Sequence, residues 1–287
     1  MKNHGLINDK TNFNEVKSFH TIRKMLNKVP EITVFFWLIK VLATTVGETA
    51  ADFLNSNLNL GLTITTFIMS GLLMITLFFQ FKFRKYVPSI YWLSVVLISV
   101  VGTLITDNLV DHFGVPLEIT TITFSAALIV TFVAWYASEK TLSIHSIYTT
   151  KREAFYWLAI LFTFALGTAA GDFVAEQLNL GYWKSALMFA GLIGVVTFAF
   201  YRFKLNSVLA FWIAYILTRP LGASLGDFLS QSRTDGGLSL GTIDTSSIFL
   251  ITILSIVIFL TITKRDQNLV GENIGYLTSS ELNETEQ

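Results

Sequence analysis

Long apolar runs separated by short polar stretches dominate the chain between residues 31 and 263. Each run is close to the roughly 20 residues that a helix needs to cross a hydrocarbon core of about 30 Å. They cover residues 31–54, 62–81, 89–110, 117–136, 154–176, 183–203, 207–230 and 247–263. One such run could be a buried helix of a soluble domain. Eight in succession predict an all-α polytopic membrane protein with eight transmembrane helices.

A tandem repeat accompanies these runs. Tryptophan, glycine and aspartate recur with fixed spacing, and the four sets are Trp37/Gly47/Asp52, Trp92/Gly102/Asp107, Trp157/Gly167/Asp172 and Trp212/Gly222/Asp227. A fixed period of this size is typical of repeat architectures. Each repeat contains two apolar runs, so we expect four tandem helical hairpins that all start on the same side of the membrane. Such parallel repeats are related by an axis along the membrane normal.

A second level of duplication relates residues 30–148 to residues 149–265. The segment Leu58–Gly61 recurs at Leu178–Gly181. The odd-numbered runs carry the repeated polar residues, so we expect them to line the interior and the even-numbered runs to face lipid. An arm of residues 1–29 precedes the first half. An acidic tail, residues 266–287, follows the second, and we expect it to be disordered.

Composition and charge support a membrane protein. The chain is 52% hydrophobic and 14% charged, against about 25% charged in soluble domains. It has no cysteine, which excludes disulfides and thiolate metal sites. Most Lys and Arg residues lie in the N-terminal arm and in the loops at 82–85, 140–152, 202–204 and 264–265. By the positive-inside rule, both termini are expected in the cytoplasm.

Aromatic residues gather near the same, basic side of the predicted spans. They are Tyr86, Tyr91, Trp92, Trp135, Tyr136, Tyr156, Trp157, Tyr201 and Trp212. Such clusters are typical of an aromatic belt at the membrane interface, or of plain lipid-facing surface.

The repeated glycines predict close helix packing. Gly47, Gly102, Gly167 and Gly222 each precede a small residue by four positions, and in the last two repeats that residue is Gly171 or Gly226. Residues four apart share a helix face, and small residues on one face let two helices approach closely in lipid.

The repeated aspartates are candidate ion-binding and proton-exchanging groups, because carboxylates inside a membrane are costly. Further acids lie four residues from three of them and share their helix faces. The full candidate set is Asp52, Asp107, Asp172, Asp227, Glu48, Asp111 and Glu176. Oxygen ligands without Cys favour hard cations, with the four aspartates as candidate metal ligands. Alternatively, the aspartates only end helices at the wetted membrane surface.

Two basic residues lie deeper in the predicted spans. Lys40 belongs to the first run, and Arg219 precedes Pro220 in the seventh. A buried cation is costly unless it is paired, so we expect intramembrane ion pairs with carboxylates of neighbouring helices. For Lys40, an extended side chain that reaches the interface is the alternative.

Two segments resemble a known family. Gly47–Leu54 (GETAADFL) and Thr218–Leu229 (TRPLGASLGDFL) are similar to signatures of bacterial inner-membrane proteins. This family is usually labelled as uncharacterised membrane-anchored proteins and is built of four repeats of unknown function. The resemblance covers about residues 30–265 and implies a bacterial plasma membrane location, but no activity.

The residues favour a secondary transporter of a hard cation, either a divalent metal ion or Na⁺ or H⁺. The chain has no ATP-binding motif, so the energy for transport would come from an ion gradient or from a partner. The alternatives are a transporter of a small organic or cationic solute and a non-transport membrane scaffold or accessory subunit. We find no hydrolase or metalloprotease motif, and we expect no enzyme activity, cofactor or nucleic acid. The expected partners are the lipid bilayer and a small cation.

Overall fold

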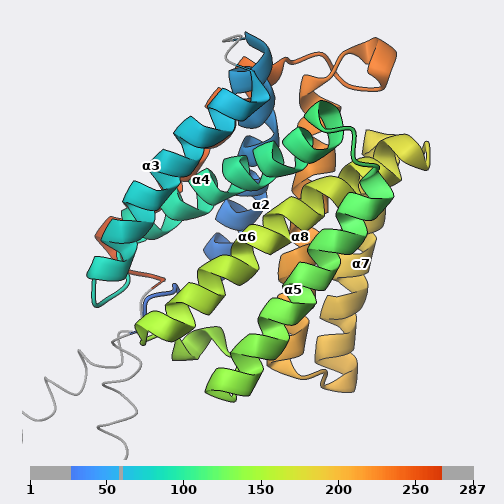
Figure 1. Ribbon diagram of the computed structural model, residues 1–287. Helices are drawn as coiled ribbons and strands as arrows, with labels where there is room; N and C mark the ends of the chain where they lie inside the picture. Colours follow the sequence, from blue (N-terminus) through green and yellow to red (C-terminus); the bar gives the residue numbers. More distant parts are fainter. Residues whose placement is uncertain (1–26, 58–60, 267–287) are drawn as a thin grey trace, which may run out of the picture.

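The computed structural model describes residues 27–57 and 61–266. All eight predicted spans are α-helices within this part of the chain (Figure 1). Their bounds are α2 Val34–Asp52, α3 Leu62–Lys82, α4 Pro88–Asp107, α5 Leu117–Glu139, α6 Thr150–Asp172, α7 Tyr182–Phe203, α8 Ser207–Ser230 and α9 Thr242–Thr263. Each is long and apolar enough to cross a membrane, and the described residues contain no strand. The predicted fold class is confirmed.

The structure describes only small parts of the predicted N-terminal arm and of the predicted C-terminal tail. Residues 1–26 of the predicted arm and residues 267–287 of the predicted tail lie outside the described residues. The arm residues that the structure describes are well packed, because Asn27, Lys28 and Val29 are all buried. Asp266, the first residue of the predicted tail, is buried as well.

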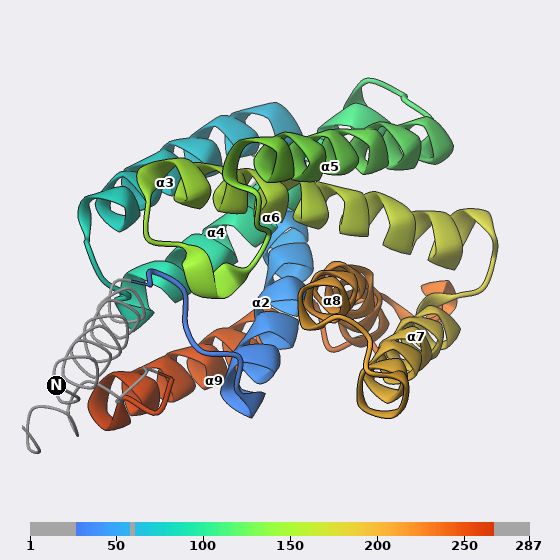
Figure 2. The same ribbon diagram turned by 90° about the horizontal axis from the view of Figure 1, so that it is seen from below.

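The four odd-numbered spans form an inner ring. Helices α2, α4, α6 and α8 pack in the order α2–α4–α6–α8, and α8 returns to α2 (Figure 2). Between 56% and 67% of the most apolar window of each inner helix is buried, against 11% to 28% for α3, α5, α7 and α9. The outer helices therefore present most of their apolar side chains to lipid, as predicted.

Each outer helix packs against the inner helix of the next repeat. Helix α3 lies along α4, α5 along α6, and α7 along α8. The last outer helix, α9, lies along α2 and closes the ring (Figure 2). The two helices of one repeat are consecutive in the chain, but they make little contact along their lengths.

Glycines hold the inner ring together. A side chain at each repeated glycine would collide with the neighbouring inner helix. The residues that it would meet are Ser99 for Gly47, Phe164 for Gly102, Arg219 for Gly167 and Thr44 for Gly222. Each contacted residue lies three positions before the glycine of its own repeat, so the contact is cyclic. The predicted role of these glycines in close packing is confirmed.

The two later small positions differ from each other. A Cβ atom at Gly226 would lie 3.2 Å from Glu48 Cβ, which is tight. A Cβ atom at Gly171 would lie 3.6 Å from Ala223 Cβ, an ordinary contact. Of these two glycines, only Gly226 lies in a tight contact, and this contact brings the candidate site residue Glu48 close to α8.

Aromatic residues fill the basic end of the ring, which is the end where the inner helices begin. The exposed fractions of Tyr91, Trp135 and Tyr156 are 0%, and the hydroxyls of Tyr91 and Tyr156 lie 2.5 Å apart. Of the nine predicted belt residues, only Tyr136 and Tyr201 are exposed, and for these two the belt stays a prediction. For the other seven rings the prediction was wrong, because they pack on one another inside the bundle.

Polar contacts fix the segment before α2 and the residue Asp266 at this basic end. Lys28 Nζ lies 2.6 Å from Glu153 Oε2, and both side chains are buried. Tyr86 donates a hydrogen bond of 2.5 Å to Asp266 Oδ2, and the amide of Glu31 donates to the carbonyl of Asp266. Burial raises the pKa of the Asp266 carboxyl. Asp266 therefore connects the end of the last repeat to the start of the first.

Candidate functional site

The repeated aspartates lie at the opposite, acidic end of the ring. Asp52, Asp107 and Asp172 are the last residues of α2, α4 and α6. Each is followed by one π-helical turn, and these turns are Phe53–Asn57, Asn108–His112 and Phe173–Gln177. Helix α8 instead stays α-helical past Asp227 to Ser230. Isolated π turns are often found at functional sites, and sequence analysis did not predict them.

Three acids from three inner helices converge. Oxygen atoms of Glu48 on α2, Asp172 on α6 and Asp227 on α8 all lie within 4.8 Å of one another, close enough to share a metal ion. Glu48 and Asp227 are buried, and Asp172 is half-buried. We call these three residues the carboxylate triad.

The other predicted acids are arranged around the triad. Asp52 accepts a hydrogen bond of 3.3 Å from Gln231 Nε2, and Asp107 ends α4 half-buried. Neither belongs to the triad. Asp111 and Glu176 are exposed, and Glu176 accepts a hydrogen bond from the Tyr182 hydroxyl.

The face that Asp111 and Glu176 share with the preceding aspartate stays a prediction. Both lie in π-helical turns, whose backbone hydrogen bonds join residues five apart in place of residues four apart as in an α-helix. For Glu48 and Asp52, which both lie in the regular part of α2, the spacing argument still applies.

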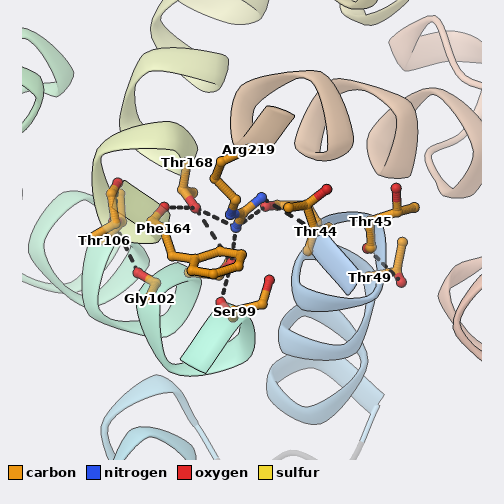
Figure 3. A network of polar contacts seen from close by, with 12 residues as sticks. Thr44, Thr45, Thr49, Ser99, Gly102, Thr106, Phe164, Thr168 and Arg219 are labelled. Carbon is orange, nitrogen blue, oxygen red and sulfur yellow. Dashed lines mark hydrogen bonds and ion pairs between the residues drawn. The ribbon is translucent and has the colours of Figure 1, made fainter. Parts of the chain in front are cut away.

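Arg219 lies next to the triad and contacts all three other inner helices (Figure 3). It is fully buried, with an exposed fraction of 0%. Its Nη2 donates to Glu48 Oε2 at 3.0 Å, to Thr168 Oγ1 at 2.6 Å and to Thr103 Oγ1. Its Nη1 lies 3.4 Å from the Thr44 carbonyl. The predicted ion pair of Arg219 is confirmed.

The partners of Arg219 occupy equivalent positions in the repeats. Glu48, Thr103 and Thr168 each follow the repeat glycine by one residue. Sequence reasoning missed the two threonines, because a lone Thr in an apolar helix is common. Reading every column of the repeat alignment, and not only the invariant columns, would have revealed them.

Lys40 has no ion pair, so the prediction for this residue was wrong. Its Nζ is buried without a hydrogen-bond partner and lies 3.8 Å and 4.2 Å from the ring centroids of Phe164 and Tyr215. Aromatic faces attract a cation, and the Phe164 ring also faces the Arg219 guanidinium at 5.5 Å. Lys40 lies two helical turns before Glu48 in α2, too far along the helix to reach the triad directly.

A groove of about 640 Å³ lies elsewhere, toward the basic end between α2, α7 and α8. Its lining is mainly apolar and includes Trp37, Phe200 and Phe211. None of the seven predicted acids lines it. The groove is therefore separate from the carboxylate triad.

These features define a multi-pass helical membrane protein made of four repeats arranged in a ring. A family model named Repeat of Unknown Function (DUF347) matches residues 35–86, 90–141, 155–206 and 210–266. The chain belongs to this family, and each match contains one inner and one outer helix. No curated protein and no solved structure matches the chain.

Proposed function

We propose that this protein is a secondary transporter of a hard cation, with the carboxylate triad as its binding site. The observation that carries this proposal is the convergence of Glu48, Asp172 and Asp227 within 4.8 Å. Three carboxylates brought this close repel one another, and the cost is highest where burial lowers the dielectric. A bound cation or shared protons would offset that repulsion.

The chemistry of the triad favours hard ions. Its ligands are all carboxylate oxygens, the type that Mg²⁺, Ca²⁺ and Mn²⁺ prefer. Asp52 and Asp107 lie at the same end of the ring and could guide a cation to the triad through their negative charge. Protons are the natural exchange ion, because a carboxylate can hold a proton in place of a metal ion.

The membrane arrangement follows from the charge distribution. We propose a bacterial plasma membrane location with both termini in the cytoplasm. The basic loops support this orientation through the positive-inside rule. The acidic end would then open outward, and the packed aromatic residues would close the cytoplasmic end of this conformation.

Cation flux into proteoliposomes tests the proposal. We expect the reconstituted full chain to admit Mn²⁺, detected by quenching of a trapped fluorescent dye. The variants Asp227→Asn and Asp172→Asn should reduce the flux at least tenfold, because each removes one charged ligand. Asp244→Asn is the matched control, since Asp244 is an exposed acid in the first turn of α9.

A membrane scaffold is the competing function, and the Arg219 network favours it by linking all four inner helices. Under that function the native protein would carry no ion. The triad variants would also lower the thermal stability of the protein. Equal Mn²⁺ flux in Asp227→Asn, Asp172→Asn and Asp244→Asn would reject the triad as the binding site.

A further inference from the structure

Arg219 places a fixed positive charge beside the carboxylate triad. Its guanidinium contacts Glu48 at 3.0 Å, and arginine stays protonated in proteins. The same Nη2 atom also donates hydrogen bonds to the hydroxyls of Thr103 on α4 and Thr168 on α6. Arg219 is therefore anchored independently of Glu48, and it can stay in place when an ion reaches the triad.

Arg219 forms an ion pair with Glu48 but not with Asp227, the triad residue on its own helix. The exposed fraction of Asp227 is 7%, yet its carboxylate has no hydrogen bond or ion pair with any described residue. Its oxygen points toward Glu48 and Asp172. A buried carboxylate without a partner is costly, so this side chain indicates a ligand that is positively charged.

We propose that Arg219 determines the charge of the cation that the triad selects. Glu48, Asp172 and Asp227 carry three negative charges when ionised, and Arg219 cancels one of them. A single divalent cation balances the remaining two. A monovalent ion would leave a net negative charge on the group formed by the triad and Arg219. A trivalent ion would leave a net positive charge there, and either excess is costly where the dielectric is low. This inference rests on the proposed function and names its substrate class, a divalent metal ion.

Lys40 makes no direct contact with the triad. Its ammonium group lies 3.8 Å from the centroid of the Phe164 ring and has no hydrogen-bond partner. It therefore provides a matched control, as a second buried basic residue of the same bundle that does not touch the triad.

Competition between Tb³⁺ and Mn²⁺ for the purified full chain in detergent tests the proposal. Tb³⁺ binding is followed by its luminescence, and Mn²⁺ affinity by displacement. In the Arg219→Gln variant the preference should move toward Tb³⁺ by at least about tenfold, because the site now carries one more uncompensated negative charge. Lys40→Met should change the preference much less than Arg219→Gln, because Lys40 does not touch the triad.

If Arg219→Gln does not fold, a second variant still tests the proposal. Asp227→Asn removes one negative charge, so Mn²⁺ should bind at least about tenfold more weakly and Na⁺ should compete better than before. Selectivity that is unchanged in both folded variants would overturn the role of Arg219 but leave cation binding intact. Failure of the unmodified chain to bind Mn²⁺, Tb³⁺ or Na⁺ would overturn both the inference and the proposed function.

Discussion

Single residues at repeated positions decide how closely the inner helices approach. The glycines of the four repeats leave no room for a side chain, since each faces a residue of the neighbouring inner helix. The last of these contacts, between Gly222 and Thr44, joins the fourth repeat to the first. The same close approach brings Arg219 within reach of groups on three other helices. Packing and polar contacts therefore depend on the same few positions.

Gly102→Ala tests this dependence. A Cβ atom at Gly102 would lie 2.7 Å from Phe164 Cβ and 3.1 Å from the Ala165 amide nitrogen. Neither atom is at the end of a flexible side chain, so we expect a loss of about 1–3 kcal/mol, typical of overpacking. Thermal unfolding in detergent measures the effect. Gly71→Ala is the control, because a Cβ atom at Gly71 meets nothing within 4 Å, and an equal loss in both variants would contradict the packing argument.

At the scale of elements, inner and outer helices differ in function as well as in burial. The inner helices carry the triad, and three of them end in π-helical turns that begin just after an aspartate. The outer helices are apolar on most of their surface and use only a narrow face for packing. In α7, the buried residues are Ser185, Ala186 and Phe189. Hydropathy alone cannot identify that face, because lipid and protein neighbours accept the same side chains.

Two phenylalanines of α7 test how narrow this packing face is. Phe189 has an exposed fraction of 5%, and Phe198 one of 61%. Phe189→Ala should destabilise the protein by about 3 kcal/mol, the low end for a buried Phe-to-Ala change. Phe198→Ala should have little effect, because lipid fills the space that the ring leaves. Unfolding temperatures in one detergent compare them, and similar values for both variants would argue against the packing of α7 on α8.

At the scale of the whole molecule, the ring is closed by elements from opposite ends of the chain. Helix α9 packs along α2, and the hydroxyls of Thr49 and Ser246 lie 2.7 Å apart across this contact. Asp266 adds hydrogen bonds to Tyr86 and to the Glu31 amide. Each outer helix covers the following repeat, so the first inner helix would be uncovered without the last outer helix.

Truncation of the chain tests this closure. A chain that ends after Gly241 lacks α9 and its contacts with α2, so we expect loss of the folded state in detergent. A chain that ends after Asp266 keeps every closing contact described above and should unfold at the same temperature as the full chain. Size-exclusion profiles and unfolding temperatures measure both. A stable, monodisperse product of the shorter chain would show that α9 is not needed for closure.

For the described residues, the sequence alone determined the eight apolar spans, the four repeats, the inner position of the odd-numbered spans and the packing role of the glycines. These features follow from local quantities, namely the transfer free energy of each run and the residue spacing along one helix. Tertiary structure alone decided that outer helices cover the next repeat, that Lys40 lies against aromatic rings, and that Glu48, Asp172 and Asp227 converge without Asp52 and Asp107. Those outcomes depend on the shapes of helices far apart in the chain and on the distances between them. Hydropathy and periodicity describe one segment at a time and contain no information about such distances.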